Sequence, residues 1–129
     1  EEYKQLEGDP LVKGQIKERQ RKMAMNRMMS QVPGADVIVR NPTHIAIALK
    51  YDSEKNSAPI VVAKGQDYVA LKIIEIAEKY KIPMTENKPL AHALYKAVDL
   101  NREIPEDYYV IIAEIMAWVY SQKKEMKQY

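Results

Sequence analysis

The sequence contains no cysteine, and only two histidines and one tryptophan among its 129 residues. The lack of cysteine excludes disulfide bonds and thiolate metal sites, and it fits a reducing compartment. His44 and His92 are too few to form a metal cluster of the usual kind. We therefore expect a protein that uses no metal and no other cofactor.

Long hydrophobic runs and an excess of one charge are also missing. No stretch approaches the ~20 apolar residues that span a membrane, and residues 1–4 do not have the pattern of a signal peptide. With 20 Lys and Arg against 18 Asp and Glu, the net charge of +2 gives no reason to expect nucleic acid as a partner. No catalytic triad, phosphate loop or metal site is visible, which argues against an enzyme that acts on a separate substrate.

The hydrophobic pattern predicts four strands and four helices in a chain long enough to bury a core. Strands are expected at 36–40, 45–51, 60–63 and 82–84, and helices at 11–30, 65–80, 87–98 and 104–124. The third strand, the helix after it and the fourth strand form a βαβ unit, so these two strands should be parallel. The expected fold is α/β: a small four-stranded mixed sheet surrounded by helices, with a projecting N-terminal linker helix.

Apolar residues at helical spacing predict which side chains are buried. The predicted inward residues of the helix at 65–80 are Leu71, Ile74 and Ala77, with Ile73 and Ile76 beside them. The predicted seam of the last helix is Tyr109, Ile112, Met116, Val119 and Tyr120, and Trp118 is also expected to pack in the core or seam. The strand at 37–39 is entirely β-branched and should be central in the sheet.

The tetrapeptide Asn41-Pro42-Thr43-His44 lies between the first two predicted strands. Ordinary deamidation of Asn41 is closed, because it needs the next residue's backbone N–H and proline has none. The remaining cyclisation runs the other way: the Asn41 side-chain nitrogen attacks its own main-chain carbonyl, closes a succinimide and expels the Pro42 nitrogen. The motif therefore predicts a single-turnover cleavage of the backbone between Asn41 and Pro42, without a metal or a second protein.

The residues leave several alternatives open at this motif. Asn-Pro is also an ordinary turn dipeptide, in which case the turn is inert. If cleavage occurs, His44 either transfers a proton or orders the loop, because histidine is the side chain that titrates near neutral pH. The Thr43 hydroxyl is expected to make a local turn hydrogen bond. Pro42 restricts Asn41 to extended backbone, which favours attack on the carbonyl.

Several motifs in order along the chain resemble the self-cleaving cytoplasmic domain of the FlhB/YscU family of export-gate proteins, with the flagellar branch the nearer. The resemblance extends from about Met23 to Lys124. The matching runs are GADVIVRNPTH at 34–44, APIVVAKG at 58–65, PLA and ALY within 89–95, IP at 104–105 and AE at 113–114. His92 stands where the family usually carries arginine, which puts in doubt any partner contact that needs that arginine. A structural role on a helix surface is the expected one for His92.

The resemblance implies a function and a location. Residues 1–30 would be a juxtamembrane linker helix, and residues 31–129 an autocleaving cytoplasmic switch domain. Family members carry transmembrane helices before this domain, so the chain would lie on the cytoplasmic face of the bacterial inner membrane. The implied partners are other export-gate and export-ATPase complex proteins, the hook-length control protein and export substrates, and cleavage would switch export substrate specificity. The alternative is a protein-binding module of the export gate that does not cleave.

Overall fold

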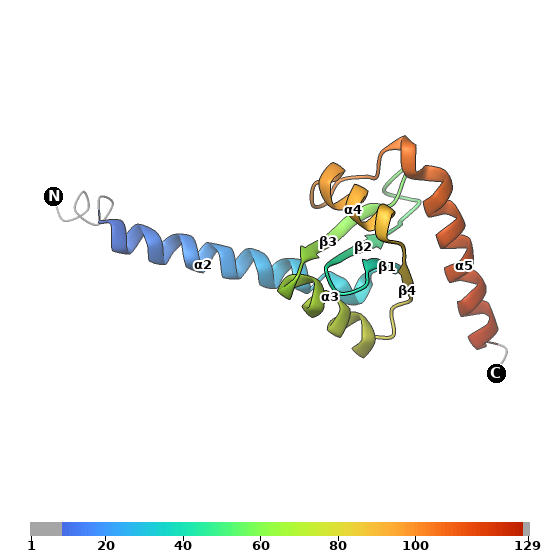
Figure 1. Ribbon diagram of the computed structural model, residues 1–129, viewed down its shortest axis with the longest axis horizontal. Helices are drawn as coiled ribbons and strands as arrows, with labels where there is room; N and C mark the ends of the chain where they lie inside the picture. The colour runs from blue at the N-terminus through green and yellow to red at the C-terminus, as the bar shows by residue number, and fades with distance from the viewer. Residues whose placement is uncertain (1–8, 128–129) are drawn as a thin grey trace. The chain divides into compact units, whose positions relative to one another are not determined.

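The structure is a computed structural model that describes residues 9–127 (Figure 1). The chain divides into two compact units, Glu1–Ser30 and Gln31–Tyr129. The first contains helix α2, Pro10–Met29. The second contains, in chain order, the short 3-10 helix η1 (Val32–Gly34), strands β1 (Val37–Asn41), β2 (Ile45–Lys50) and β3 (Ile60–Gln66), helix α3 (Tyr68–Lys79), strand β4 (Met84–Glu86), helix α4 (Lys88–Ala97), the short 3-10 helix η2 (Glu106–Tyr108) and helix α5 (Tyr109–Lys127).

Helix α2 begins as its sequence predicts. The Asp9 side chain caps it by accepting a hydrogen bond from the Leu11 backbone N–H at 2.9 Å, and Pro10 occupies the first turn, where a missing N–H costs nothing. None of the residues of α2 is buried. Within residues 9–127, none of the helices is both long enough and apolar enough to cross a bilayer.

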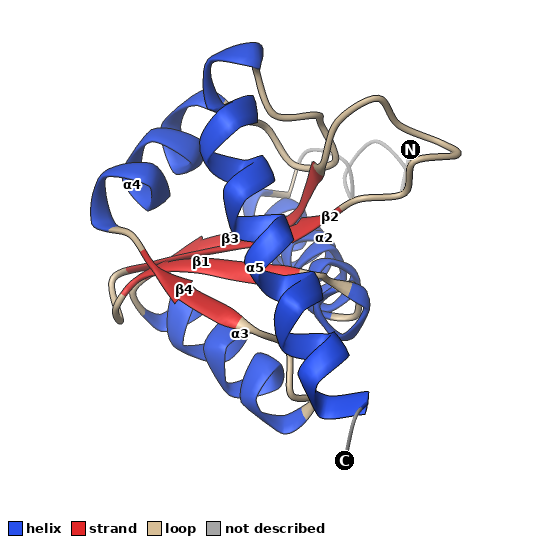
Figure 2. Ribbon diagram, turned by 90° about the vertical axis from the view of Figure 1, so that its right-hand side faces the viewer, coloured by secondary structure: helices blue, strands red, loops and turns tan. Residues whose placement is uncertain are grey.

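The second unit is built on a four-stranded mixed sheet with the order β3-β2-β1-β4 (Figure 2). Strand β1 runs antiparallel to β2 and parallel to β4, and β2 runs antiparallel to β3. The predicted α/β class is confirmed, and the β-branched strand β1 is central as expected. Strands β3 and β4 point the same way, as the βαβ pattern predicts, but they lie on opposite edges with β2 and β1 between them.

Helices cover both faces of this sheet. The main core joins alternate residues of β1 and β2 to α4 and α5, and Figure 2 shows these two helices on one side of the sheet with α3 on the other. Side chains of a strand alternate between faces, so Ala46 and Ala48 point away from α4 and α5. Both alanines are fully buried. The small residues on that face let α3 pack closely, and the sheet is buried on both sides.

Four large apolar side chains that the helical spacing places inside are exposed instead. Leu71 is 49% exposed, and Tyr109, Trp118 and Tyr120 are 41%, 42% and 52% exposed. The buried face of α3 is Ala70, Ile73, Ile74 and Ala77, with Leu71 just outside it. The buried stripe of α5 is Ile112, Met116 and Val119, because α5 contacts the rest of the core along one narrow seam.

Several element boundaries also differ from the sequence-based expectation. Strand β3 extends to Gln66, so Gly65 lies in the strand and helix α3 starts at Tyr68 instead of at residue 65. The fourth strand starts at Met84 and extends to Glu86, so Pro83 lies just before it. The Pro83 carbonyl accepts a hydrogen bond from the Ile38 N–H at 2.9 Å, a contact that needs no N–H from proline. The last helix starts with one turn of 3-10 helix at Glu106–Tyr108 before α5.

Gly65 on β3 occupies a position with no room for a side chain. A Cβ built there would lie 2.7 Å from the Cβ and 3.0 Å from the carbonyl carbon of Val69, and nearer still to a Val69 methyl group. We expect Gly65→Ala to lower the free energy of unfolding of the second unit by about 1–3 kcal/mol. The urea midpoint measures this.

The matched control is Gly14→Ala on α2, where nothing lies within 4 Å of the added carbon. Alanine favours the helix by about 1 kcal/mol relative to glycine. Because Gly14 lies in the first unit and the added carbon meets no other atom, the change should leave the urea midpoint of residues 31–129 unchanged. Equal midpoints for the two variants would contradict the steric argument.

Candidate functional site

The candidate site is the tight turn that joins β1 to β2. Asn41 is the last residue of β1 and pairs with Ile45, the first residue of β2, so the three residues Pro42, Thr43 and His44 close the hairpin. Inside the turn the His44 backbone N–H donates a hydrogen bond to the Asn41 carbonyl oxygen at 2.6 Å. This carbonyl belongs to the Asn-Pro peptide bond, and a fixed N–H on its oxygen stabilises negative charge that develops there.

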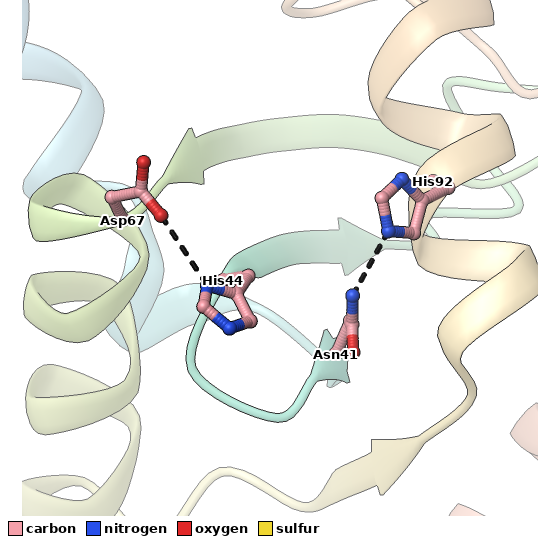
Figure 3. A network of polar contacts seen from close by, with 4 residues as sticks. All are labelled: Asn41, His44, Asp67 and His92. Carbon is pink, nitrogen blue, oxygen red and sulfur yellow. Dashed lines mark hydrogen bonds and ion pairs between the residues drawn. The ribbon is translucent and has the colours of Figure 1, made fainter.

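The Asn41 side chain points into the protein rather than into the turn. Asn41 is 5% exposed and is the one buried polar or charged residue in the part of the chain that the structure describes. Its Nδ2 lies 2.9 Å from Nε2 of His92 on α4 (Figure 3). Asn41 therefore occupies volume in the protein interior, and its burial and hydrogen bond hold the amide in one place.

His92 is the site residue that sequence reasoning missed. It lies on α4, 51 residues from Asn41 in the chain, and the residue is exposed to solvent. It is a histidine on a helix surface, as expected, but its ring also forms the polar contact of the buried Asn41 amide. The departure from the family's arginine at this position is the one signal in the sequence that singled out His92.

Helix α4 is tied to the turn by its own N-terminus. The Asn87 backbone N–H donates to the Arg40 carbonyl at 3.1 Å, next to Asn41. The Asn87 side chain caps α4 by accepting from the Leu90 N–H at 3.1 Å. Since His92 follows little more than one turn later, these bonds fix its position relative to Asn41.

The His44 side chain is 71% exposed, and its Nδ1 lies 3.5 Å from the Asp67 carboxylate (Figure 3). The Asp67 backbone N–H also donates to the His44 carbonyl at 2.8 Å. Asp67 has a φ of 53°, an unfavourable conformation for a residue other than glycine. A strained residue between β3 and α3 thus holds the end of the turn by two contacts, a role that the sequence did not predict.

The remaining two motif residues face solvent. Pro42 and Thr43 are exposed, and within residues 9–127 the Thr43 hydroxyl makes no hydrogen bond. In the same range, no group of three His, Asp or Glu side chains is arranged to hold a metal ion. The chemistry available at the turn is therefore that of Asn41, the two histidines and the backbone.

A second concave feature is an apolar groove of about 380 Å³ beside α5. Residues from the segment between β2 and β3 and from α5 line it, among them Tyr51, Pro59, Ile112 and Met116. None of its lining residues belongs to the turn, and none of them is a histidine, a carboxylate, a lysine or an arginine.

Comparison with known proteins gives a consistent result. A family model described as the FlhB HrpN YscU SpaS Family matches residues 1–119. The chain is 56% identical over 126 residues to the flagellar biosynthetic protein FlhB of Bacillus subtilis (strain 168), an alignment that covers 98% of this chain and 35% of that protein. It is 50% identical over 124 residues to the FlhB of Salmonella typhimurium, with 96% of this chain and 32% of that protein covered. The chain thus spans about a third of the length of the curated relatives it matches.

Solved structures show the same fold. The cytoplasmic domain of FlhB from Shewanella putrefaciens superposes with a TM-score of 0.77 at 43% identity, covering 81% of this chain and 80% of that chain. A mutated form of the EscU C-terminal domain superposes with a TM-score of 0.69 at 38% identity, covering 71% of this chain and 92% of that chain.

Proposed function

Because this chain belongs to the FlhB HrpN YscU SpaS family, we propose that it is the cytoplasmic part of a membrane component of a flagellar or type III protein-export apparatus. The family resemblance seen in the sequence is confirmed by the family model and by the FlhB relatives. We propose further that the chain cleaves its own backbone between Asn41 and Pro42, and that this single-turnover event switches the export apparatus from one class of substrate to the next.

The burial of Asn41 carries the cleavage proposal. A plain turn places its asparagine in solvent, whereas this fold buries Asn41 to 5% exposure and holds its side-chain nitrogen against His92. Holding the reacting groups in one arrangement is the main help that a fold can give to a poor nucleophile. The His44 N–H at 2.6 Å from the carbonyl oxygen supports the same reaction by stabilising the tetrahedral intermediate.

The four motif residues have separate roles in this proposal. Asn41 supplies the nucleophilic nitrogen and the carbonyl carbon. Pro42 supplies the leaving nitrogen and restricts Asn41 to extended backbone. His44 acts through its backbone N–H and orders the loop through Asp67, because its side chain is bound to that carboxylate and is 71% exposed. Thr43 is the middle residue of the three that connect β1 to β2, and it has no chemical role in the proposal.

The arrangement in the cell is also a proposal. Residues 1–30 would link the membrane part to the switch domain 31–129 at the cytoplasmic face of the bacterial inner membrane. The basic residues of α2, such as Arg19, Arg21 and Lys22, would suit anionic lipid headgroups. The proposed partners are other export-gate and export-ATPase complex proteins, the hook-length control protein and the export substrates, with no role for nucleic acid.

The alternative is a protein-binding module of the export gate whose Asn-Pro turn is inert. The apolar groove beside α5 is the observation in its favour, because a concave surface rich in aliphatic side chains is typical of binding sites. A binding role for the groove and cleavage at the turn are compatible, so only the covalent state of the Asn41-Pro42 bond separates the two functions.

Denaturing electrophoresis with intact-mass analysis of the purified chain tests the proposal. We expect two fragments, residues 1–41 and 42–129, with proline at the new N-terminus. The first fragment should end in a succinimide or in its hydrolysis products. A single full-length species after prolonged incubation at neutral pH would instead favour the inert binding module.

A further inference from the structure

The contact between His92 and Asn41 goes beyond holding a buried amide. Resting on the proposed cleavage, we propose that His92 is the general base of the reaction and takes the proton from the attacking Asn41 nitrogen. The main evidence for this role is the distance of 2.9 Å between Asn41 Nδ2 and His92 Nε2. An amide nitrogen only donates hydrogen bonds, so Nε2 must be the acceptor. This contact assigns the lone pair of the His92 ring to Nε2 and its N–H to Nδ1.

The reaction needs a proton acceptor at this atom. The amide nitrogen becomes a competent nucleophile only if it loses a proton as it forms its new bond. In the proposed step the Nδ2–C bond forms to the Asn41 carbonyl carbon, and one Nδ2 proton passes to His92 Nε2. The C–N bond to Pro42 then breaks, and the same proton, directly or through a water molecule, ends on the Pro42 nitrogen. The other Nδ2 proton stays on the succinimide, so atoms and charges balance without a co-reactant.

The two histidines act on opposite partners of the new bond. The His44 backbone N–H holds the carbonyl oxygen at 2.6 Å, while His92 Nε2 holds the nucleophile at 2.9 Å. Figure 3 shows the His44 ring directed to Asp67 and the His92 ring directed to Asn41. The geometry therefore favours His92 on α4, and not His44 of the motif, as the residue that accepts the proton.

No other group competes for His92 Nε2. Within residues 9–127 the ring forms no ion pair, and its one hydrogen bond is to Asn41. The charged residues of the surrounding elements lie on α4 itself and on the four strands. They are Lys88 and Lys96 one turn before and after His92, Arg40, Lys50, Lys64 and Glu86. Lys64 is already bound to the carbonyls of Tyr95 and Val98 at 3.0 and 2.9 Å.

The proposal is particular to chains with histidine at this position. Arginine has no acceptor atom and does not release its proton in proteins. A relative with arginine here needs another proton acceptor, such as solvent, whereas this chain has one in direct contact with the nucleophile.

The test follows the cleavage rate of the full chain after cell-free synthesis, by denaturing electrophoresis across about pH 5 to 8, where histidine titrates. The variants are His92→Gln and His92→Ala, with His44→Gln as a comparison at the histidine of the motif. Glutamine can accept the hydrogen bond from Asn41 but cannot take its proton. We expect both His92 variants to cleave about 10²-fold more slowly, the low end for loss of a general base. The wild type and His44→Gln should slow on the acid side as the base becomes protonated, and the His92 variants should lose that dependence.

Other outcomes overturn the proposal in distinct ways. A His92→Gln variant that cleaves at the wild-type rate while His92→Ala is slow would make His92 a positioning residue only. Persistence of the acid-side fall in both His92 variants would assign it to another group. A wild-type chain that never cleaves would overturn the proposed function together with this role. Circular dichroism and thermal melting confirm that each variant is folded, which is expected because residue 92 faces solvent on one side.

Discussion

Replacing Asn41 with alanine should abolish backbone cleavage completely. Alanine has no side-chain nitrogen, so no succinimide can form and the Pro42 nitrogen cannot be expelled. Intact-mass analysis should give a single species of full length at all times, whereas the wild type is expected to give two fragments. Two fragments with the same boundary from the alanine variant would exclude asparagine cyclisation as the mechanism.

The variant should remain folded, although Asn41 is buried. It loses one hydrogen bond, to His92, and a net contribution of about 0.5–1.5 kcal/mol is typical of such a bond. His92 can hydrogen-bond water instead because it is exposed. A matched control is Asn26→Ala on the exposed surface of α2, which removes the same chemical group away from the turn and should cleave like the wild type.

The two fragments should stay together after cleavage. Strand β1 belongs to the fragment 1–41, and both of its neighbours, β2 and β4, belong to the fragment 42–129. Val37, Ile38 and Val39 are completely buried between them. Burial of each such side chain is worth roughly 1.5–3 kcal/mol relative to exposure, before the entropic cost of association is subtracted.

Size-exclusion chromatography of the cleaved protein should therefore give one peak that contains both fragments, and denaturant should separate them. The Ile38→Ala variant sharpens the test, because loss of a buried isoleucine typically costs about 2–5 kcal/mol. Its cleaved form should melt at a lower temperature and release residues 1–41 at a lower urea concentration. Separate peaks for the wild type in native buffer would mean that the switch acts by dissociation instead of by rearrangement of the turn.

Residues that are neighbours in the chain were sufficient to predict several elements of the fold and the chemistry expected at the turn. The β-branched run in β1 predicts a central strand, and Asp9-Pro10 predicts the start of α2, because both signals depend on neighbouring residues only. The chemistry of Asn41-Pro42 likewise follows from the covalent structure of one dipeptide. The hydrophobic pattern predicted the α/β fold, and the family resemblance added the expected export function to these inferences.

The partners of the turn could not be predicted in this way. His92 lies 51 residues from Asn41, and Asp67 lies 23 residues from His44, so only the packing of α4 and α3 on the sheet brings them together. Helical periodicity likewise placed Leu71 inside, whereas the contact of α3 with the sheet buries Ala70 and exposes Leu71. A periodic pattern defines an apolar stripe, but the exact face that is buried depends on the element it packs against. The sequence alone identifies Asn41 as the residue proposed to break the backbone, and the fold supplies the groups that hold its side-chain nitrogen and its carbonyl oxygen.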